Sequence, residues 1–278
     1  MDTNVPSEFL KDVYFVEQVP LMALQVDPRI SYALYIPKSH YTPNPNGSGS
    51  TGGKLPLLVY VHGTGRNISA IYSDLVPFTN STPCAVLAPV FPAGMDGPND
   101  LDSYKQLRSS MLCSDLGLLA VLDRVACRWP GLATEKAFMM GFSGGGQPHR
   151  FLYLYPERLA AISVGAPGRP TLLDEEQDWP LGVADAQAVF GKTVRTDLIA
   201  EVPIQLVIGS EDTRDVLGAG GLPPMKETRV ESIQQLRGSL AQAGIETQFD
   251  IVDGVAHDET GARNTVLGFL QPLIRKGF

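Results

Sequence analysis

The stretch Lys136-Ala-Phe-Met-Met-Gly-Phe-Ser-Gly-Gly-Gly146 decides how the rest of the chain is interpreted. It opens as a short apolar run of strand length that stops at Gly141 and passes into serine and glycine. Gly141-Phe-Ser-Gly-Gly145 fits G-x-S-x-G, the pattern that places a serine on a sharp turn between a buried strand and a helix. So tight a turn needs glycine because a Cβ would clash with nearby backbone. The pattern predicts that Ser143 projects beside the free amides of a helix N-terminus. The alternative is a glycine-rich turn between a strand and a helix in which Ser143 has no catalytic role.

The composition is that of an ordinary globular protein. With 278 residues, 44% of them hydrophobic and 19% charged, the chain can build a sizeable core. We interpret residues 1–278 as a single α/β domain. The net charge of −8, without any basic arm, argues against nucleic acid or an anionic membrane as a partner.

The N-terminal residues lack the basic and apolar regions of a secretory signal, and no apolar run is long enough to span a bilayer. Cys84, Cys113 and Cys127 have no metal-ligand spacing, so we expect free thiols, mostly buried. A cytoplasmic location is the prediction that follows.

Strand-like and helix-like segments alternate along most of the chain. The predicted strands cover residues 12–19, 30–36, 55–61, 84–90, 136–140, 159–164, 204–208 and 247–252. The predicted helices cover residues 68–78, 110–128, the segment from the elbow to 155, 226–243 and 260–275. The alternation predicts an α/β fold, with a doubly wound, mostly parallel sheet preceded by an antiparallel pair of strands.

Three irregular segments and one proline interrupt this alternation. Residues 37–54 are rich in proline, glycine and serine and are expected to form a surface loop. A second long loop covers residues 91–108, and residues 166–202 show no strand signal and are interpreted as a short cap inserted over the sheet edge. Pro148 removes an amide near the start of the elbow helix, which should shift or kink its first turn.

An acid and a histidine follow the serine in strand-end loops, the place where sites of such sheets lie. Asp212 comes three residues after Gly209, and His257 follows the predicted 247–252 strand by a loop of four residues. The order serine, acid, histidine is that of a nucleophilic triad. Asp212 is the preferred acid, with Glu211 and Asp215 as competitors.

A further loop can supply the oxyanion hole. His62-Gly-Thr-Gly65 follows a predicted central strand, and such a small, kinked backbone can turn an amide toward the nucleophile. We expect the amides of Gly144 and Thr64 to be the two donors, with Gly63 and Gly65 as alternatives to Thr64. His62 lies so close to the sheet that it is expected to order this loop rather than to transfer protons.

Together these motifs resemble the α/β-hydrolase superfamily over almost the whole chain. The matching pieces are His62-Gly-Thr-Gly65, Gly141-Phe-Ser-Gly-Gly145, Gly209-Ser-Glu-Asp212 and the Gly-Val-Ala-His257 tail. The size and short cap resemble the carboxylesterases and the polyhydroxybutyrate-depolymerase or feruloyl-esterase type, and also intracellular hydrolases of fungal polyketide pathways. Pro148 and the Gly218-Ala-Gly-Gly221 loop depart from the finer pattern.

The resemblance implies a serine hydrolase that cleaves an ester-like bond of a small, largely apolar molecule without metal or cofactor. Ser143 would be the nucleophile, His257 the base and Asp212 its orienting acid. Apolar side chains offered for substrate contact are Phe91, Met95, Tyr104, Phe142 and Trp179, although core packing is the competing role of each. Two alternatives stay open: condensation, cyclisation or C–C cleavage by the same triad, and a ligand-binding protein without turnover.

Overall fold

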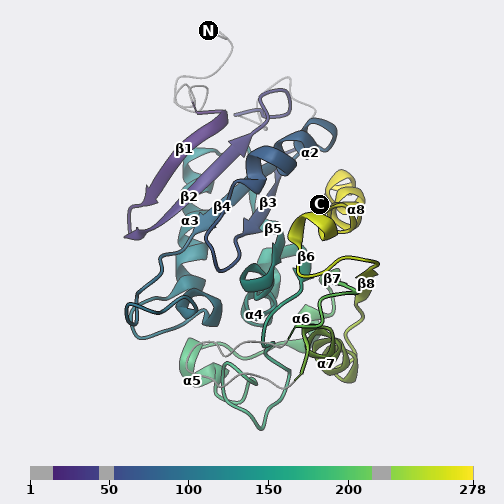
Figure 1. The fold of residues 1–278 in the computed structure, drawn as a ribbon. Helices are drawn as coiled ribbons and strands as arrows, with labels where there is room; N and C mark the ends of the chain where they lie inside the picture. Colours follow the sequence, from purple (N-terminus) through teal and green to yellow (C-terminus); the bar gives the residue numbers. More distant parts are fainter. Residues whose placement is uncertain (1–14, 44–52, 215–226, 278) are drawn as a thin grey trace, which may run out of the picture.

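The computed structural model describes residues 15–43, 53–214 and 227–277 (Figure 1). A single sheet of eight strands forms its centre, in the order β1-β2-β4-β3-β5-β6-β7-β8. The first two strands pair antiparallel, β2 pairs antiparallel with β4, and every remaining neighbour is parallel. The predicted fold class, a mostly parallel α/β sheet with an N-terminal antiparallel pair, is therefore confirmed.

The strands keep the predicted order with shifted ends. They are β1 (Glu17–Leu24), β2 (Asp27–Ile36), β3 (Leu55–Val61), β4 (Ala85–Val90), β5 (Leu132–Phe142), β6 (Leu159–Gly165), β7 (Ile204–Gly209) and β8 (Gln248–Val252). The long apolar runs lie in the middle of the sheet. Six of the seven residues of β3 are buried, as expected for a parallel strand covered on both faces.

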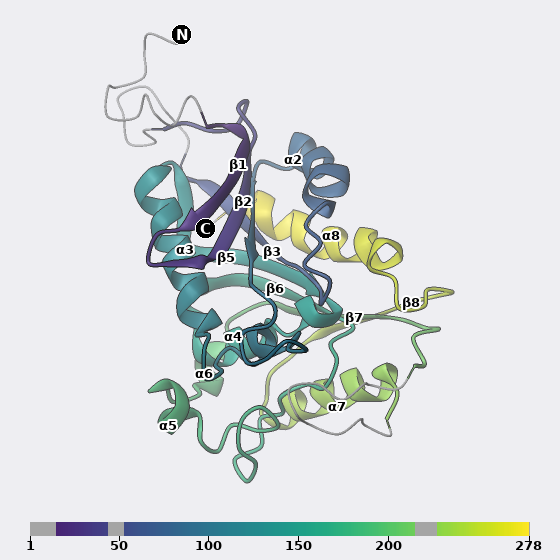
Figure 2. The same cartoon turned by 60° about the vertical axis from the view of Figure 1, so that its left-hand side comes forward.

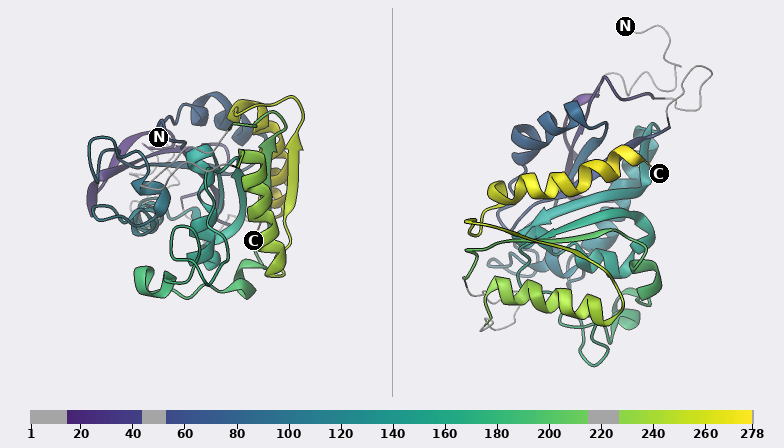
Figure 3. Two further views of the ribbon diagram at one scale, coloured as in Figure 1. Left: turned by 60° about the horizontal axis from the view of Figure 1, so that its bottom comes forward. Right: turned by 90° about the vertical axis from the view of Figure 1, so that its right-hand side faces the viewer.

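Helices cover both faces of the sheet. They are α2 (Val76–Ser81), α3 (Ser114–Arg128), α4 (His149–Leu154), α5 (Ala186–Phe190), α6 (Thr196–Ile199), α7 (Arg229–Gln242) and α8 (Glu259–Lys276). Figure 2 shows α2 and α8 on one face, with α3 and α4 on the other. The views of Figure 3 place the N-terminal strand pair and β8 at opposite margins of the sheet.

Several predicted boundaries differ from those of the structure. The first predicted strand, 12–19, extends instead from Glu17 to Leu24, and residues 12–14 lie outside the described part. The strand predicted over residues 136–140 covers Leu132–Phe142 instead, because β3 pairs with it from Leu132 and β6 pairs with it up to Phe142. The helix predicted from 110 begins at Ser114, because Arg108 and Cys113 first form an antiparallel bridge.

The elbow helix is divided in the way that Pro148 suggested. Residues Ser143–Gly146 form a 3-10 turn, and α4 starts after Pro148, which occupies its N-cap position. A second short 3-10 turn, Pro156–Arg158, follows the helix. The predicted continuous helix to residue 155 is thus two short pieces.

The segment 166–202 contains α5, α6 and turns, without a strand. It packs along α4, where Thr171 N donates to His149 Nε2 at 3.0 Å. It also contacts α7, where Leu173 N donates to Ser239 Oγ at 2.8 Å. The segment therefore flanks the elbow helix and joins it to the helix that precedes β8.

None of the helices in the described ranges is long and apolar enough to cross a membrane. Part of the predicted loop of residues 37–54 lies outside those ranges. Asp215, the 218–221 loop and residue 226, where the helix corresponding to α7 was predicted to begin, lie outside them as well.

A close backbone approach at the elbow gives a stability prediction. A Cβ at Gly145 would lie 2.1 Å from the carbonyl oxygen of Val61, so Gly145→Ala should lower the free energy of unfolding by roughly 1–3 kcal/mol, because backbone must move. Gly238→Ala in α7 is the control, since no atom lies within 4 Å of its new methyl and helix propensity improves. Urea unfolding measures both. Equal stabilities of the two variants would contradict the proposed crowding.

Candidate active site

Ser143 sits on a strained turn directly after β5. Its φ is +56°, a left-handed conformation that non-glycine residues rarely adopt. The turn lies against the end of β3: besides the contact with Val61, a Cβ at Gly145 would lie 2.9 Å from the carbonyl oxygen of His62. The strained conformation aims the serine side chain away from the strand, and glycine lets the turn pass close beneath it.

A line of hydrogen bonds joins Ser143 to two residues that lie far along the chain. Ser143 Oγ lies 2.9 Å from His257 Nε2, and His257 Nδ1 lies 2.6 Å from Asp212 Oδ2. An ionised carboxylate can only accept, so Nδ1 carries a proton for Asp212 and Nε2 of the neutral ring accepts from the serine hydroxyl. The structure thus brings together the three residues that the sequence suggested.

Hydrogen bonds between the two loops fix the distance from Asp212 to His257. Glu211 N donates to the carbonyl of Val255 at 2.9 Å, and Gly254 N donates to Ser210 Oγ at 2.9 Å. Asp212 is 1% exposed, whereas Glu211 is exposed and uses its backbone in this pairing. Of the two acids that the structure describes, Asp212 is therefore the one that reaches the histidine.

His62 orders the loop after β3, as predicted. Its Nδ1–H donates to the carbonyl of Gly63 at 2.8 Å, and its Nε2 accepts from Phe91 N at 3.1 Å. Burial lowers the pKa of His62 to about 4, so the ring is neutral and both nitrogens have backbone partners. A histidine held in this way cannot also act as a base.

Thr64 lies beside Gly144. A Cβ at Gly144 would lie 2.8 Å from Thr64 Oγ1 and 2.7 Å from Tyr104 Oη. A Cβ at Gly63 would lie 3.6 Å from the carbonyl oxygen of Phe142. A Cβ at Gly65 would have no such neighbour within 4 Å. The geometry places the loop of residues 63–65 next to the residue that follows the nucleophile, with Thr64 in contact with it.

The apolar residues offered for substrate contact fall into two groups. Phe91, Tyr104 and Phe142 are buried; the rings of Phe91 and Tyr104 stack at 5.6 Å, and Phe142 lies 5.2 Å from the ring of His257. Trp179 and Met95 are half-buried, and the indole N–H of Trp179 donates to the carbonyl of Gln106 at 2.7 Å. The first three pack beneath and around the site, so their contact with substrate stays a prediction.

The sequence analysis missed the charged residues behind the elbow. Lys105 Cε would lie 2.8 Å from a Cβ at Gly144, and its ammonium contacts Asp102. Arg150 on α4 is buried and donates to the carbonyl of Lys105 at 2.7 Å. The only signal for them was their position in the long 91–108 loop and next to Pro148, which predicts no chemistry by itself.

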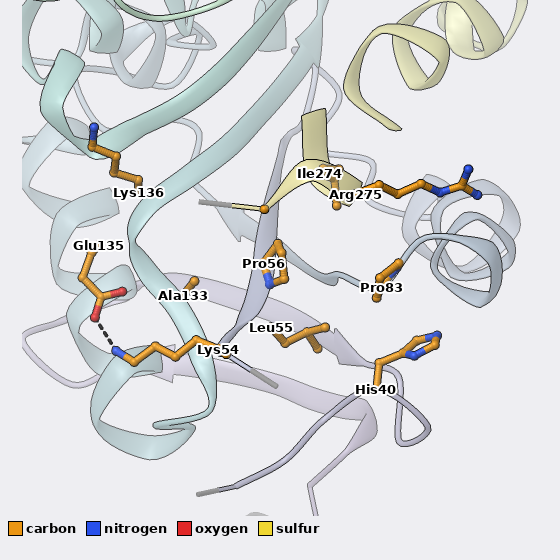
Figure 4. Close-up of a pocket in the computed structure, with 12 residues that line it drawn as sticks. His40, Lys54, Leu55, Pro56, Pro83, Ala133, Glu135, Lys136, Ile274 and Arg275 are labelled. Atoms are coloured by element: carbon orange, nitrogen blue, oxygen red, sulfur yellow. Dashed lines mark hydrogen bonds and ion pairs between the residues drawn. The ribbon is translucent and has the colours of Figure 1, made fainter. Parts of the chain in front are cut away.

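A pocket of about 800 Å³ lies at the amino ends of β3 and β5 (Figure 4). Its lining combines apolar residues with an ion pair between Lys54 and Glu135 and with the polar side chains of His40, Lys136 and Arg275. Parallel strands place that edge opposite the carboxyl ends that carry Ser143 and Asp212. The pocket is therefore separate from the hydrogen bonds that join Ser143, His257 and Asp212. In the part of the chain that the structure describes, no group of three or more histidine, cysteine or acidic residues is arranged to hold a metal ion.

Comparison with solved structures assigns the architecture. Poly(aspartic acid) hydrolase-1 from Sphingomonas sp. KT-1 superposes with a TM-score of 0.64 and 19% identity, over 86% of this chain and 92% of that one. A poly(3-hydroxybutyrate) depolymerase from Bordetella parapertussis gives 0.62 and 21%, over 87% and 83%. The chain has the α/β-hydrolase fold.

An S-formylglutathione hydrolase from Staphylococcus aureus shares this α/β-hydrolase fold with a TM-score of 0.59 and 14% identity, over 88% of this chain and 92% of that one. Neither a protein-family model nor a curated protein matches the sequence. These likenesses establish the fold, and the geometry of the residues must supply the function.

The two buried histidines should make stability fall in acid. Burial lowers the pKa of His149 to about 3 and that of His62 to about 4, whereas in the unfolded chain each has a pKa of about 6.5. Below that value the unfolded chain binds protons that the native protein does not, so the free energy of unfolding falls, by roughly 2–3 kcal/mol per histidine near pH 4.5.

His149→Gln tests this linkage in urea unfolding at about pH 7.5 and about pH 4.5. The variant should be less stable than the wild type at the higher pH, because its bonds to Gly146 and Thr171 are disturbed. It should nevertheless lose less stability on acidification. An equal loss in both proteins would mean that His149 does not titrate on unfolding.

Proposed function

We propose that this protein is a serine esterase that hydrolyses an ester bond of a small molecule through an acyl-enzyme. The observation that supports the proposal is the unbroken line of hydrogen bonds from Ser143 through His257 to the buried Asp212. A serine in a strained turn, with a neutral imidazole accepting its proton, has the arrangement of an activated nucleophile.

The proposed reaction has two steps. Ser143 Oγ attacks the ester carbonyl while His257 Nε2 takes the hydroxyl proton, and the same proton then passes to the departing alcohol. In the second step, water gives a proton to His257 and attacks the acyl-serine. His257 then returns that proton to Ser143 Oγ as the acid departs, which restores the serine hydroxyl. Asp212 holds the ring in the required tautomer and stabilises the imidazolium in both steps.

We assign the amides of Gly144 and Thr64 to the developing oxyanion. Thr64 contacts the position of Gly144, and both residues belong to backbone that glycines and His62 hold in place. Two fixed donors stabilise the negative charge of the tetrahedral intermediate. No step of this sequence needs a metal ion or an organic cofactor.

The structural neighbours that are named for a reaction are named for hydrolysis, which supports this proposal over condensation or cyclisation. The complete triad geometry supports it over a ligand-binding protein without turnover.

Ser143→Ala should abolish hydrolysis of short p-nitrophenyl esters, with a loss of at least about a thousandfold in kcat, because nothing else can form the acyl-enzyme. The variant should keep its fold, since one partly exposed hydroxyl is removed from a turn. A fluorophosphonate probe should label the wild type and leave the variant unlabelled. Full activity in a folded Ser143→Ala protein would remove the proposed nucleophile.

Asp212→Asn should lower kcat on the order of a thousandfold, because an amide no longer fixes the histidine tautomer. Glu211→Gln is the matched control: it alters the neighbouring acid, which is exposed and contributes its backbone amide to the loop. Steady-state kinetics on the same ester compare the two. A loss in Glu211→Gln as large as that in Asp212→Asn would show that the acid is misassigned.

A further inference from the structure

Three cations, Lys105, Arg66 and Arg150, lie close enough to influence one another beside the elbow, together with the carboxylate of Asp102. Lys105 contacts Asp102, both from the 91–108 loop. Arg66 donates instead to the carbonyls of Thr64, Phe91 and Pro92. Arg150 donates to Thr171 Oγ1 and to the carbonyls of Lys105, Arg169 and Pro180.

The backbone partners fix the positions of these guanidinium groups without neutralising them. The backbone of Lys105 is tied to α4 by Arg150, and its neighbour Tyr104 donates from Oη to the carbonyl of His62 at 3.1 Å. Arg66 lies over the ring of Tyr104, with its Cζ 4.7 Å from the ring centroid. The charges are therefore held on a rigid framework that also carries the loop after β3.

Lys105 is the member of this group that reaches the elbow. Its Cε would lie 2.8 Å from a Cβ at Gly144, the residue to which we assign one oxyanion donor. Its side chain is 12% exposed, so the ammonium is partly withdrawn from water without being sealed off. An ammonium has three donors, which allows Lys105 to keep Asp102 and to accept a second anionic partner.

The group of Lys105, Arg66, Arg150 and Asp102 holds three cations and one carboxylate, so positive charge is in local excess. Burial lowers the pKa of Lys105, and the charges of Arg66 and Arg150 act in the same direction, while Asp102 opposes them. This local excess contrasts with the net charge of −8 for the whole chain, so it is a property of the site and not of the surface in general.

We propose that the site selects esters whose acyl part carries a carboxylate, which binds the ammonium of Lys105 beside Gly144. This inference rests on the proposed esterase function. The alcohol part must lie against His257, because that ring returns the proton to the departing oxygen. Lys105 lies beside Gly144 and not beside His257. The acyl part of the ester, and not the alcohol part, is therefore the part that can contact Lys105.

The test compares two methyl esters with acyl chains of equal length, monomethyl adipate and methyl hexanoate, by methanol release. In the wild type we expect kcat/KM for the adipate to exceed that for the hexanoate by about tenfold, since a charged hydrogen bond has that order of strength. Lys105→Met should reduce this ratio to about one, mainly through KM for the adipate. High salt should reduce the ratio in the wild type as well.

Two further variants make the result specific. Lys136→Met removes a cation at the amino edge of the sheet, where Figure 4 shows its side chain, and should leave the ratio unchanged. Asp102→Asn removes the competing carboxylate and should raise the ratio, which tests the proposal even if Lys105→Met does not fold.

Different failures have different meanings. A wild-type ratio of one or less, or an unchanged ratio in Lys105→Met, would overturn the selection of anionic acyl groups and leave the esterase proposal standing. An unchanged or lower ratio in Asp102→Asn would overturn it too. Absence of methanol from both esters, together with absence of fluorophosphonate labelling of Ser143, would overturn the esterase proposal and this inference with it.

Discussion

The contact on which the site depends is the close approach of the elbow backbone to the end of β3. A Cβ at Gly145 would lie 2.1 Å from the carbonyl of Val61, and one at Gly141 would lie 2.0 Å from the carbonyl of Gly145. Only glycine allows the chain to turn back at this distance. The same crowding forces Ser143 into its left-handed conformation and brings Gly144 next to Thr64. The nucleophile and the two proposed oxyanion donors are therefore positioned by one steric constraint.

A second close approach joins the acid and the base. A Cβ at Gly209 would lie 2.0 Å from the carbonyl of Val255, at the point where the acid loop leaves β7 and the histidine loop leaves β8. Parallel pairing of these strands brings both loops to one edge, and the backbone bond from Glu211 to Val255 sets their register. The buried carboxylate of Asp212 then has a partner within reach, which a buried charge requires.

The buried polar residues around the elbow serve as framework. His62 and His149 are neutral and bonded at both ring nitrogens, one to the loop after β3 and the other to the segment that flanks α4. Arg150 joins α4, the 103–106 turn and the same flanking segment. Preorganisation of this kind holds the donors in place before substrate arrives, at the cost of burying groups that cannot ionise freely.

The sequence by itself determined the fold class and singled out the three residues of the hydrogen-bonded line, because both leave local signals. Alternating apolar and polar segments mark a parallel sheet, and the glycines around Ser143 mark a turn that no other residue could make. Strand ends in parallel sheets lie at one edge, so Asp212 and His257 could be grouped with the serine before any distance was known.

Only the tertiary structure decided between Asp212 and Glu211, since both follow the same strand and they differ in burial and in contact with His257. It also divided the elbow helix at Pro148 and moved Phe91, Tyr104 and Phe142 into the packing around the site. Lys105, Arg66 and Arg150 carry no motif and come from separate loops and a helix. Their convergence depends on long-range packing, which no local pattern in the sequence records.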